Sequence, residues 1–192
     1  MRKLTKYQLQ KISKNLDKYF NMATENDIKS GLTWYQNAND ICKDIAQKYD
    51  TTTFVASGVI SALSPRNKWY KNIQDAYTVF EAVKNNIEAV DTKVSTFHTN
   101  KFKAFAIAQG KVTITSESKK TFAFCENIAN LNEDYITVDV WHLRACFDMT
   151  MGSIGDLAYE QLQKITLSKA KKLGLRGFEY QAIIWGSIQN NF

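Results

Sequence analysis

The sequence predicts a mostly α-helical protein, and three observations support this fold class. Apolar residues recur every three to four positions through most of the chain, a spacing typical of amphipathic helices. One proline and eight glycines in 192 residues are too few for a β sandwich with many turns. Hydrophobic residues make up 44% of the chain, which is enough to bury a core. The length fits one compact helical domain over residues 1–192, or two packed lobes with a cleft between them.

Four helices are expected in the first half of the chain, over about residues 9–19, 34–49, 52–63 and 69–85. The third of these is strongly apolar, so we expect it to be buried at the centre of the fold. Ser64 and Pro65 end it, because proline disfavours helical backbone in the residue before it. The polar stretch 91–100 has no apolar stripe and is predicted to link two helical lobes. We assign no role to His98 within it.

Five helices are expected in the second half, over about residues 102–109, 120–130, from 140 onward, 157–173 and 178–189. Residues 111–131 are predicted to form a hairpin-like element, in which a connection at 111–119 leads into a helix. The alternation of polar and apolar residues over 111–115 leaves a short β hairpin open as an alternative. Asp156 is the expected N-cap of the helix that follows it, and Gly174 its expected end.

The chain is basic, with 25 Lys and Arg against 19 Asp and Glu, a net charge of +6 and a pI near 9.1. This balance favours an acidic partner without identifying it. The N-terminal basic residues are not followed by a long apolar run, so we expect no signal peptide, no membrane span and a cytoplasmic protein. The widely spaced Cys42, Cys125 and Cys146 are expected to be reduced and buried. We expect no metal and no cofactor.

Three basic clusters stand out, at residues 66–71, at residues 101–103 and at residues 169–172 with Arg176. In the first two, aromatic residues alternate with basic ones, as at surfaces where bases stack beside bound phosphates. The first cluster supplies the candidate phosphate contacts Arg66, Lys68 and Lys71 and the candidate stacking residues Trp69 and Tyr70. The alternative is that Trp69 and Phe102 are core anchors and that the lysines solvate helix faces.

A lone carboxylate, Asp139, directly follows an apolar run, and the pair Lys119-Lys120 lies one predicted helix upstream. Asp139 and Lys120 are 139 − 120 = 19 positions apart. One helix of about a dozen residues plus a short connection would span that distance and return both side chains to one cleft. We therefore predict a catalytic pair that acts on a glycosidic carbon.

These residues resemble a known signature. Residues 114–121, followed by 137–139, resemble the motif of the helix-hairpin-helix (HhH-GPD) DNA glycosylase superfamily, in which Leu-Pro-Gly-Val-Gly-x-Lys-Thr precedes Val-Asp. Residues 60–65 with Ala76 similarly resemble the Leu-Leu-Ser stretch that opens the DNA-binding cleft of that superfamily. The resemblance covers roughly residues 50–150, and the chain is most similar to small phage-encoded members.

The sequence departs from the superfamily pattern at several positions. Ser116 and Ser118 stand where the superfamily has glycines with positive φ, so these serines are expected to be strained in that conformation. Trp141 stands where many relatives carry histidine, and His142 follows it. Arg144 matches the superfamily. Three cysteines are too few for the four-cysteine iron–sulfur cluster of some relatives.

The resemblance implies a two-lobed helical glycosylase-like fold and an enzyme that cleaves the N-glycosidic bond of a flipped, modified or damaged base. Asp139 would stabilise the positive charge that develops at C1′ or activate the nucleophile. Lys120 would attack C1′ as an amine and add an AP-lyase activity. The resemblance further implies DNA contacts at Ser116, Ser118, Lys119 and Arg144, and a base pocket lined by Trp69, Tyr70, Trp141 and His142. The simpler hypotheses are that Asp139 caps a helix and that Lys120 contacts only water or phosphate.

Two other functions remain open. Phage enzymes similar to α-glutamyl or putrescinyl thymidine pyrophosphorylases complete thymine hypermodification, and there Asp139 would activate an amine instead of water. The second of these functions is a non-catalytic DNA-binding module, which the missing hairpin glycines suggest. All three hypotheses make DNA the partner of a monomeric protein with no membrane attachment, in the cytoplasm of a bacterial host if the chain is phage-encoded.

Overall fold

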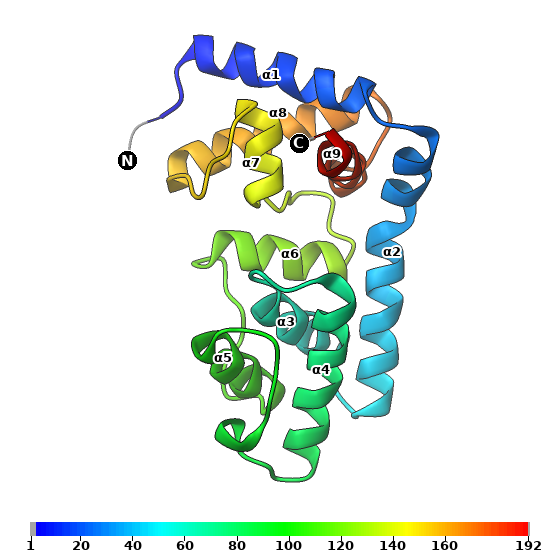
Figure 1. Cartoon of the computed structure of the whole chain (residues 1–192), viewed down its shortest axis with the longest axis vertical. Coiled ribbons are helices and arrows are strands. Elements are labelled where there is room, and N and C mark those ends of the chain that lie inside the picture. The colour runs from blue at the N-terminus through cyan, green and yellow to red at the C-terminus, as the bar shows by residue number, and fades with distance from the viewer. Residues whose placement is uncertain (1–2, 192) are drawn as a thin grey trace. The chain divides into compact units, whose positions relative to one another are not determined.

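A computed structural model describes residues 3–191 of the chain, with side chains as far as residue 189. Over these residues the chain forms nine α-helices, one short 3-10 helix and no strand (Figure 1). The helices are α1 (Lys6–Asn21), α2 (Glu25–Lys48), α3 (Thr53–Leu63), α4 (Trp69–Lys84), η1 (Ala89–Asp91), α5 (His98–Ala108), α6 (Lys119–Ala129), α7 (Val140–Phe147), α8 (Asp156–Lys172) and α9 (Gly177–Asn191). The mostly α-helical fold class is therefore confirmed, and each expected helix is present.

The alternative of a β hairpin at residues 111–115 is wrong, because this segment is an irregular connection between α5 and α6. Ile114 is buried while the residues on either side of it are exposed. The alternation in the sequence therefore reflects a single apolar anchor in a connection. No second strand pairs with it among residues 3–191.

The predicted polar linker at 91–100 is also wrong at both ends. The η1 helix ends at Asp91 and α5 begins at His98, which leaves only residues 92–97 irregular. The buried face of α5 begins with Lys101, whose amine is itself buried, so a search for apolar residues at helical spacing does not detect the start of this helix.

The predicted N-cap of α8 is shifted by one residue. Gly155 is the N-cap and Asp156 is the first helical residue, where its negative charge interacts favourably with the helix dipole.

The described chain divides into two compact units. Unit 1 contains residues 3–37 and 132–191, and unit 2 contains residues 38–131. The boundary falls inside α2, so the first part of that helix belongs to unit 1 and the rest to unit 2. Residues 91–100 lie entirely within unit 2, so they do not link the two units.

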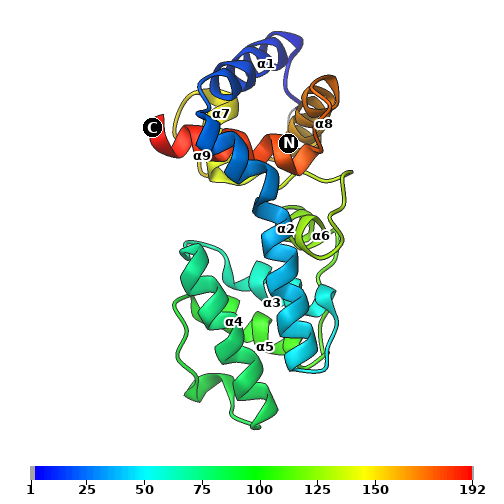
Figure 2. The same ribbon diagram turned by 90° about the vertical axis from the view of Figure 1, so that its right-hand side faces the viewer.

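Unit 1 packs α1, α7, α8 and α9 around one core (Figure 2). Leu16, Leu162 and Ile188 are fully buried there. The first part of α2 approaches α9 at Gly31, where a side chain would lie only 2.6 Å from the backbone nitrogen of Ile183. Glycine is therefore required at this position by close packing.

The helix α7 of unit 1 is held at its C-terminal end by α1. Asn15 donates its side-chain amide to the carbonyl oxygen of Cys146 at 2.9 Å. The next turn ends at Asp148, which has left-handed backbone with φ 54° and accepts hydrogen bonds from Lys18 at 2.9 Å and from the hydroxyl of Tyr19. This anchoring fixes the helix that Asp139 precedes.

Unit 2 is built around α3, whose residues from Ala56 to Leu63 are all buried. The helix packs against α4, α5 and α6, so the prediction of a buried central helix is confirmed. The hydroxyl of Ser57 donates to the carbonyl oxygen of Cys125 at 2.9 Å and ties α3 to α6. From α2, the amide of Asn39 donates to the carbonyl oxygens of Ile128 and Ala129, which lie at the C-terminal end of α6.

The three cysteines are free and buried, as predicted. Burial raises the pKa of Cys42 and Cys125 to about 12 and also raises the pKa of Cys146, so the thiols stay protonated. Among the helices of the described residues, none has the length and apolar character that crossing a membrane requires.

Candidate functional site

Asp139 is the N-cap of α7. Its carboxylate oxygen Oδ1 accepts a hydrogen bond from the backbone N–H of His142 at 2.8 Å, and its own backbone is extended. The capping hypothesis for Asp139 is confirmed. The side chain is half-buried, so the cap holds a carboxylate at the margin of the core of unit 1.

The extended segment that leads into Asp139 is fixed by buried side chains from other helices of unit 1. The hydroxyl of Tyr159, on α8, donates to the carbonyl oxygen of Ile136 at 3.1 Å and accepts the N–H of Val138 at 3.3 Å. The amide of Gln181, on α9, donates to the carbonyl oxygen of Thr137 at 2.8 Å. Buried backbone groups are thus satisfied without a strand partner, and the position of the segment is set.

Tyr35, on α2, completes this network by donating its hydroxyl to Oε1 of Gln181 at 3.2 Å. Burial raises the pKa of Tyr35, and the charge of Asp139 adds to the effect. Burial likewise raises the pKa of Tyr159 to about 12. Both hydroxyls therefore remain protonated near neutral pH and act as hydrogen-bond donors.

The sequence interpretation assigned no role in the site to Tyr35, Tyr159 or Gln181. A signal was present for Gln181, a polar residue inside the apolar run 180–185 of α9. A buried amide must be hydrogen-bonded, so its partners were worth seeking. For the two tyrosines the pattern is that of ordinary core residues.

Asp139 lines a narrow recess of unit 1 together with His142, Gln181, Ile184 and Trp185, and this recess has no room for a water molecule. Asp139 is only half-buried, so the recess does not enclose it. The indole N–H of Trp185 is buried and has no hydrogen-bond partner among the described residues. The ring of Trp185 packs edge-on against Trp34 at 5.4 Å between centroids.

His142, predicted to line a base pocket, is a core residue with 3% of its surface exposed. Its Nε2 lies 2.9 Å from the hydroxyl oxygen of Thr166. Burial lowers the pKa of His142 to about 4, so the ring is neutral at pH 7. The recess beside it is too narrow for a base, so it gives no support to the pocket role of His142, which stays a prediction.

Trp141 and Arg144 contact each other. The guanidinium carbon of Arg144 lies 4.3 Å from the ring centroid of Trp141, and both side chains are half-buried. This cation–π contact occupies one face of the indole ring. A base stacked on Trp141 would have to use its other face.

The connection before α6 does not have the positive φ angles of the glycines in the superfamily motif. Neither Ser116 nor Ser118 has positive φ, and Ser118, the N-cap of α6, has φ −95°. The prediction that these serines are strained is therefore wrong, because serine adopts such backbone angles readily.

The two lysines at the start of α6 differ in exposure. Lys120, in the first turn of α6, is exposed, and Lys119 is half-buried. Lys120 belongs to unit 2 and Asp139 to unit 1.

The first basic cluster is organised by a buried carboxylate, Asp75, which is 1% exposed. Asp75 accepts hydrogen bonds from the side-chain amide of Asn67 and from the backbone N–H of Ser95, both at 2.9 Å. The amine of Lys71 lies 3.7 Å from its other oxygen. Asp75 thereby joins the connection before α4 to the connection before α5.

Arg66 projects from the connection that Asp75 holds. Its backbone is left-handed with φ 58°, and its guanidinium carbon lies 5.8 Å from the ring centroid of Phe97. Arg66 and Lys68 are exposed and have no ion pair among the described residues. The sequence interpretation missed Asp75 and Phe97, because Ser95 lies 20 positions from Asp75 and Phe97 lies 97 − 66 = 31 positions from Arg66.

In the other two basic clusters, some of the basic side chains are engaged within the protein. Lys101 is buried and donates its amine to the carbonyl oxygen of Thr92 at 2.9 Å, so in the second cluster only Lys103 contributes charge to the surface. Its neighbour Phe102 is 47% exposed, so Phe102 is not a core anchor.

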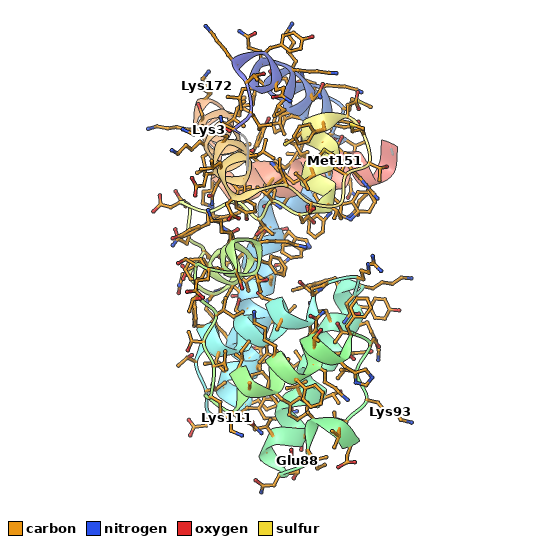
Figure 3. The ribbon with its side chains drawn as sticks, turned by 90° about the vertical axis from the view of Figure 1, so that its left-hand side faces the viewer. Lys3, Glu88, Lys93, Lys111, Met151 and Lys172 are labelled. Atoms are coloured by element: carbon orange, nitrogen blue, oxygen red, sulfur yellow. The ribbon has the colours of Figure 1, made fainter. Side chains whose placement is uncertain are left out.

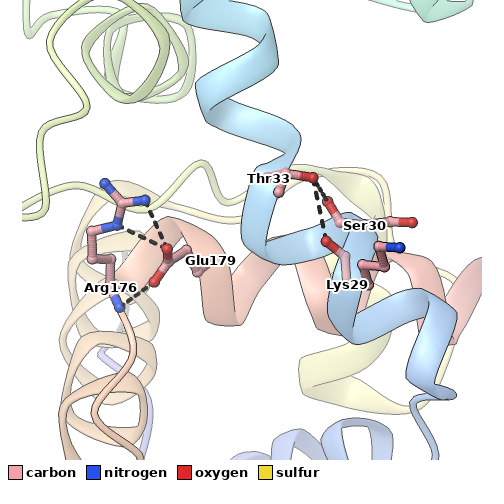
Figure 4. A network of polar contacts seen from close by, with 5 residues as sticks. All are labelled: Lys29, Ser30, Thr33, Arg176 and Glu179. Carbon is pink, nitrogen blue, oxygen red and sulfur yellow. Dashed lines mark hydrogen bonds and ion pairs between the residues drawn. The ribbon is translucent and has the colours of Figure 1, made fainter.

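In the third cluster, two of the four basic side chains have acidic partners. Lys169 pairs with Asp17 at 2.6 Å. Arg176 pairs with Glu179 at 2.7 Å, and Figure 4 shows this pair together with Thr33 of α2, which donates to the carbonyl oxygens of Lys29 and Ser30. Lys172 remains exposed and extends from the surface of α8 (Figure 3).

Unit 2 also contains an open groove of about 660 Å³. Its wall includes Tyr49 and Tyr77, and the amine of Lys48 lies 5.0 and 5.2 Å from the centroids of their rings. The hydroxyl of Tyr49 donates to Glu81 at 3.1 Å. None of the residues predicted from the sequence to bind DNA or to react lines this groove. Within the described residues, no group of three His, Cys, Asp or Glu side chains is placed to hold a metal ion.

Comparison with known protein families matches the whole chain, residues 1–192, to one family model, the family of unknown function DUF7178. The chain therefore belongs to this family. Neither the curated proteins nor the solved structures that were compared with the chain gave a match.

Proposed function

We propose that the protein is a DNA-acting enzyme of the helix-hairpin-helix glycosylase type, which removes a flipped base by cleaving its N-glycosidic bond. The observation that carries the proposal is the way unit 1 presents Asp139. A half-buried carboxylate stands at the N-terminus of a helix, on a backbone segment fixed by Tyr159 and Gln181. An ordinary helix cap needs no such support, whereas a catalytic carboxylate needs a fixed position.

In the proposed reaction the bond between C1′ and the base nitrogen breaks, and the base leaves with the electron pair. Positive charge develops on the sugar, and the carboxylate of Asp139 stabilises it. A water molecule adds its oxygen to C1′, and the carboxylate takes the proton that this water loses. The capping hydrogen bond from His142 keeps the carboxylate oriented through these steps.

DNA binding in the proposal rests on the first basic cluster. Arg66 and Lys68 are exposed cations on a connection that Asp75 holds in place. Exposed cations on a preorganised backbone bind phosphates at a lower entropic cost than mobile ones. The net charge of +6 acts in the same direction.

We propose hydrolysis by water in preference to attack by Lys120. The side chain of Lys120 is exposed in the first turn of α6, so its amine keeps its hydration. A lysine that forms a Schiff base is normally desolvated or placed next to another cation to supply the neutral amine. In this proposal Lys119 and Lys120 contact DNA phosphates at the start of α6.

The proposal includes the finer fold class. Unit 1 and unit 2 correspond in it to the two lobes of a glycosylase-like fold, and the connection after α5 together with α6 corresponds to the hairpin-like element at residues 111–131. Its support is the order of the elements, because a helix, a short connection and a second helix precede the capped helix that starts after Asp139.

The test is to incubate the full chain with oligonucleotides that each carry one modified or damaged base. Free base, abasic sites and altered nucleosides are measured by mass spectrometry, with Asp139→Asn as the matched control. We expect free base and abasic sites with the wild type and none with Asp139→Asn. An altered nucleoside without base release would favour thymine hypermodification instead. No change in any substrate would contradict both enzymatic functions and leave the DNA-binding module.

A further inference from the structure

Two large aromatic side chains of unit 2 lie in solvent next to the exposed cations of the first basic cluster. Tyr70, in the first turn of α4, is 62% exposed, and Phe97, the N-cap residue of α5, is 54% exposed. Both positions flank the connections that Asp75 joins. Single exposed aromatics are common, but two of them beside two cations are not explained by packing.

The structure holds this surface in place. The left-handed backbone of Arg66 is unfavourable for a residue with a side chain, and it persists because Asn67, the next residue, is bonded to the buried Asp75. With this backbone conformation, the guanidinium of Arg66 lies over the ring of Phe97. The N–H of Ser95 binds the same carboxylate, two residues before Phe97. Cation and ring are thus placed before any ligand arrives.

We propose that Arg66, Lys68, Tyr70 and Phe97 form a platform that binds unpaired nucleotides of DNA. The cations take the phosphates, and bases stack on the ring of Tyr70 and on the face of Phe97 opposite Arg66. In a duplex the faces of the bases are covered by their neighbours, so exposed rings gain contact area only where bases are unstacked. The choice of DNA as the partner rests on the proposed function, whereas the preference for unpaired bases rests on the two rings.

The experiment measures binding of the full chain to a fluorescently labelled single-stranded oligonucleotide and to the corresponding duplex, by anisotropy at several salt concentrations. We expect the single strand to bind more tightly than the duplex. Replacing either ring, in Tyr70→Leu or Phe97→Leu, should weaken single-strand binding about 5- to 150-fold and duplex binding much less. Tyr70→Phe keeps the ring and should retain the affinity.

Two variants serve as controls for general effects of ring and charge. Tyr7→Leu removes a ring that is 75% exposed in α1, and Lys84→Gln removes an exposed cation at the C-terminal end of α4 in unit 2. Both should bind the single strand like the wild type. Circular dichroism verifies that each variant keeps its helical content.

Several results would overturn the platform. Equal affinity for single strand and duplex would do so, as would unchanged affinity in both leucine variants or binding to neither oligonucleotide. Tighter binding to single-stranded RNA of the same sequence would overturn the choice of DNA. Failure of the proposed function is seen separately, because a chain that binds unpaired DNA and releases no base keeps the platform and loses the glycosylase.

Discussion

Gln181 and Asp139 share one hydrogen-bond acceptor. The side-chain amide of Gln181 donates to the carbonyl oxygen of Thr137 at 2.8 Å, and the backbone N–H of Asp139 donates to the same oxygen at 2.9 Å. A buried side chain on α9 therefore fixes the backbone from which the carboxylate projects. This relationship links the stability of unit 1 to the function proposed for Asp139.

Gln181→Met is expected to lower the free energy of unfolding by about 1–3 kcal/mol, because it removes one of the two hydrogen bonds to the carbonyl oxygen of Thr137 and the buried hydrogen bond that Gln181 accepts from Tyr35. Urea unfolding followed by circular dichroism measures the loss. Tyr35→Phe, which removes only one hydroxyl, should cost about 1 kcal/mol and serves as the milder control. If Gln181→Met unfolds at the same urea concentration as the wild type, the network does not hold the segment.

Asp139→Asn should leave the free energy of unfolding within a few tenths of a kcal/mol, since asparagine caps helices as well as aspartate does. Asp139→Ala removes the cap and should cost about 1 kcal/mol. Turnover, by contrast, should fall by orders of magnitude in both variants, because both remove the negative charge. An Asn variant with normal turnover would reduce Asp139 to its capping role.

Lys120→Gln should retain base release, and no covalent protein–DNA adduct should form when the wild type is treated with borohydride during turnover. The reason is that Lys120 is exposed and its amine stays hydrated. Lys119→Gln is the neighbouring control. An adduct that forms in the wild type and in Lys119→Gln but disappears in Lys120→Gln would establish the lyase mechanism and contradict hydrolysis by water.

Stability should fall as the pH drops from about 6.5 to about 4. Burial lowers the pKa of His142 from 6.5 to about 4, so in this window the unfolded chain binds a proton that the folded chain does not. The free energy of unfolding is unaffected by the titration of His142 above pH 6.5, and it decreases by about 3 kcal/mol between pH 6.5 and pH 4. Urea unfolding at pH 7, 5.5 and 4.5 measures it, and His142→Gln should flatten the dependence. His98→Gln, at the exposed first residue of α5, should not.

The cations of the first basic cluster should differ in their effect on the salt dependence of DNA binding. Arg66→Gln and Lys68→Gln should each reduce the slope of log K against log salt concentration by about 0.7 for single-stranded DNA of any sequence. Lys71→Gln should lower it less, because Lys71 lies 3.7 Å from the buried carboxylate of Asp75 and is partly neutralised. Equal effects of all three variants would contradict the role of Asp75 as the partner of Lys71.

Local pattern was sufficient for the presence of each helix and for the cap at Asp139, although it misplaced the start of α5 and the N-cap of α8. The spacing of Ile12, Leu16 and Tyr19 predicts α1, and these residues are buried in it. Asp139 caps the helix that begins at the next residue, and the atoms involved are only three residues apart. The physical reason is that helices and caps are satisfied within about one turn, so their requirements appear in consecutive residues.

Long-range contacts decided what each candidate residue does, and the sequence contains no local trace of them. Lys101 looked like part of a basic surface, yet its amine is buried against the carbonyl of Thr92. Arg66 and Phe97 are 97 − 66 = 31 positions apart and meet only because Asp75 accepts hydrogen bonds from both connections. The helices and the basic charge follow from the sequence alone. Which charges are buried, paired or free to bind depends on packing between segments that are distant in the chain, because burial and pairing are properties of the surroundings in three dimensions.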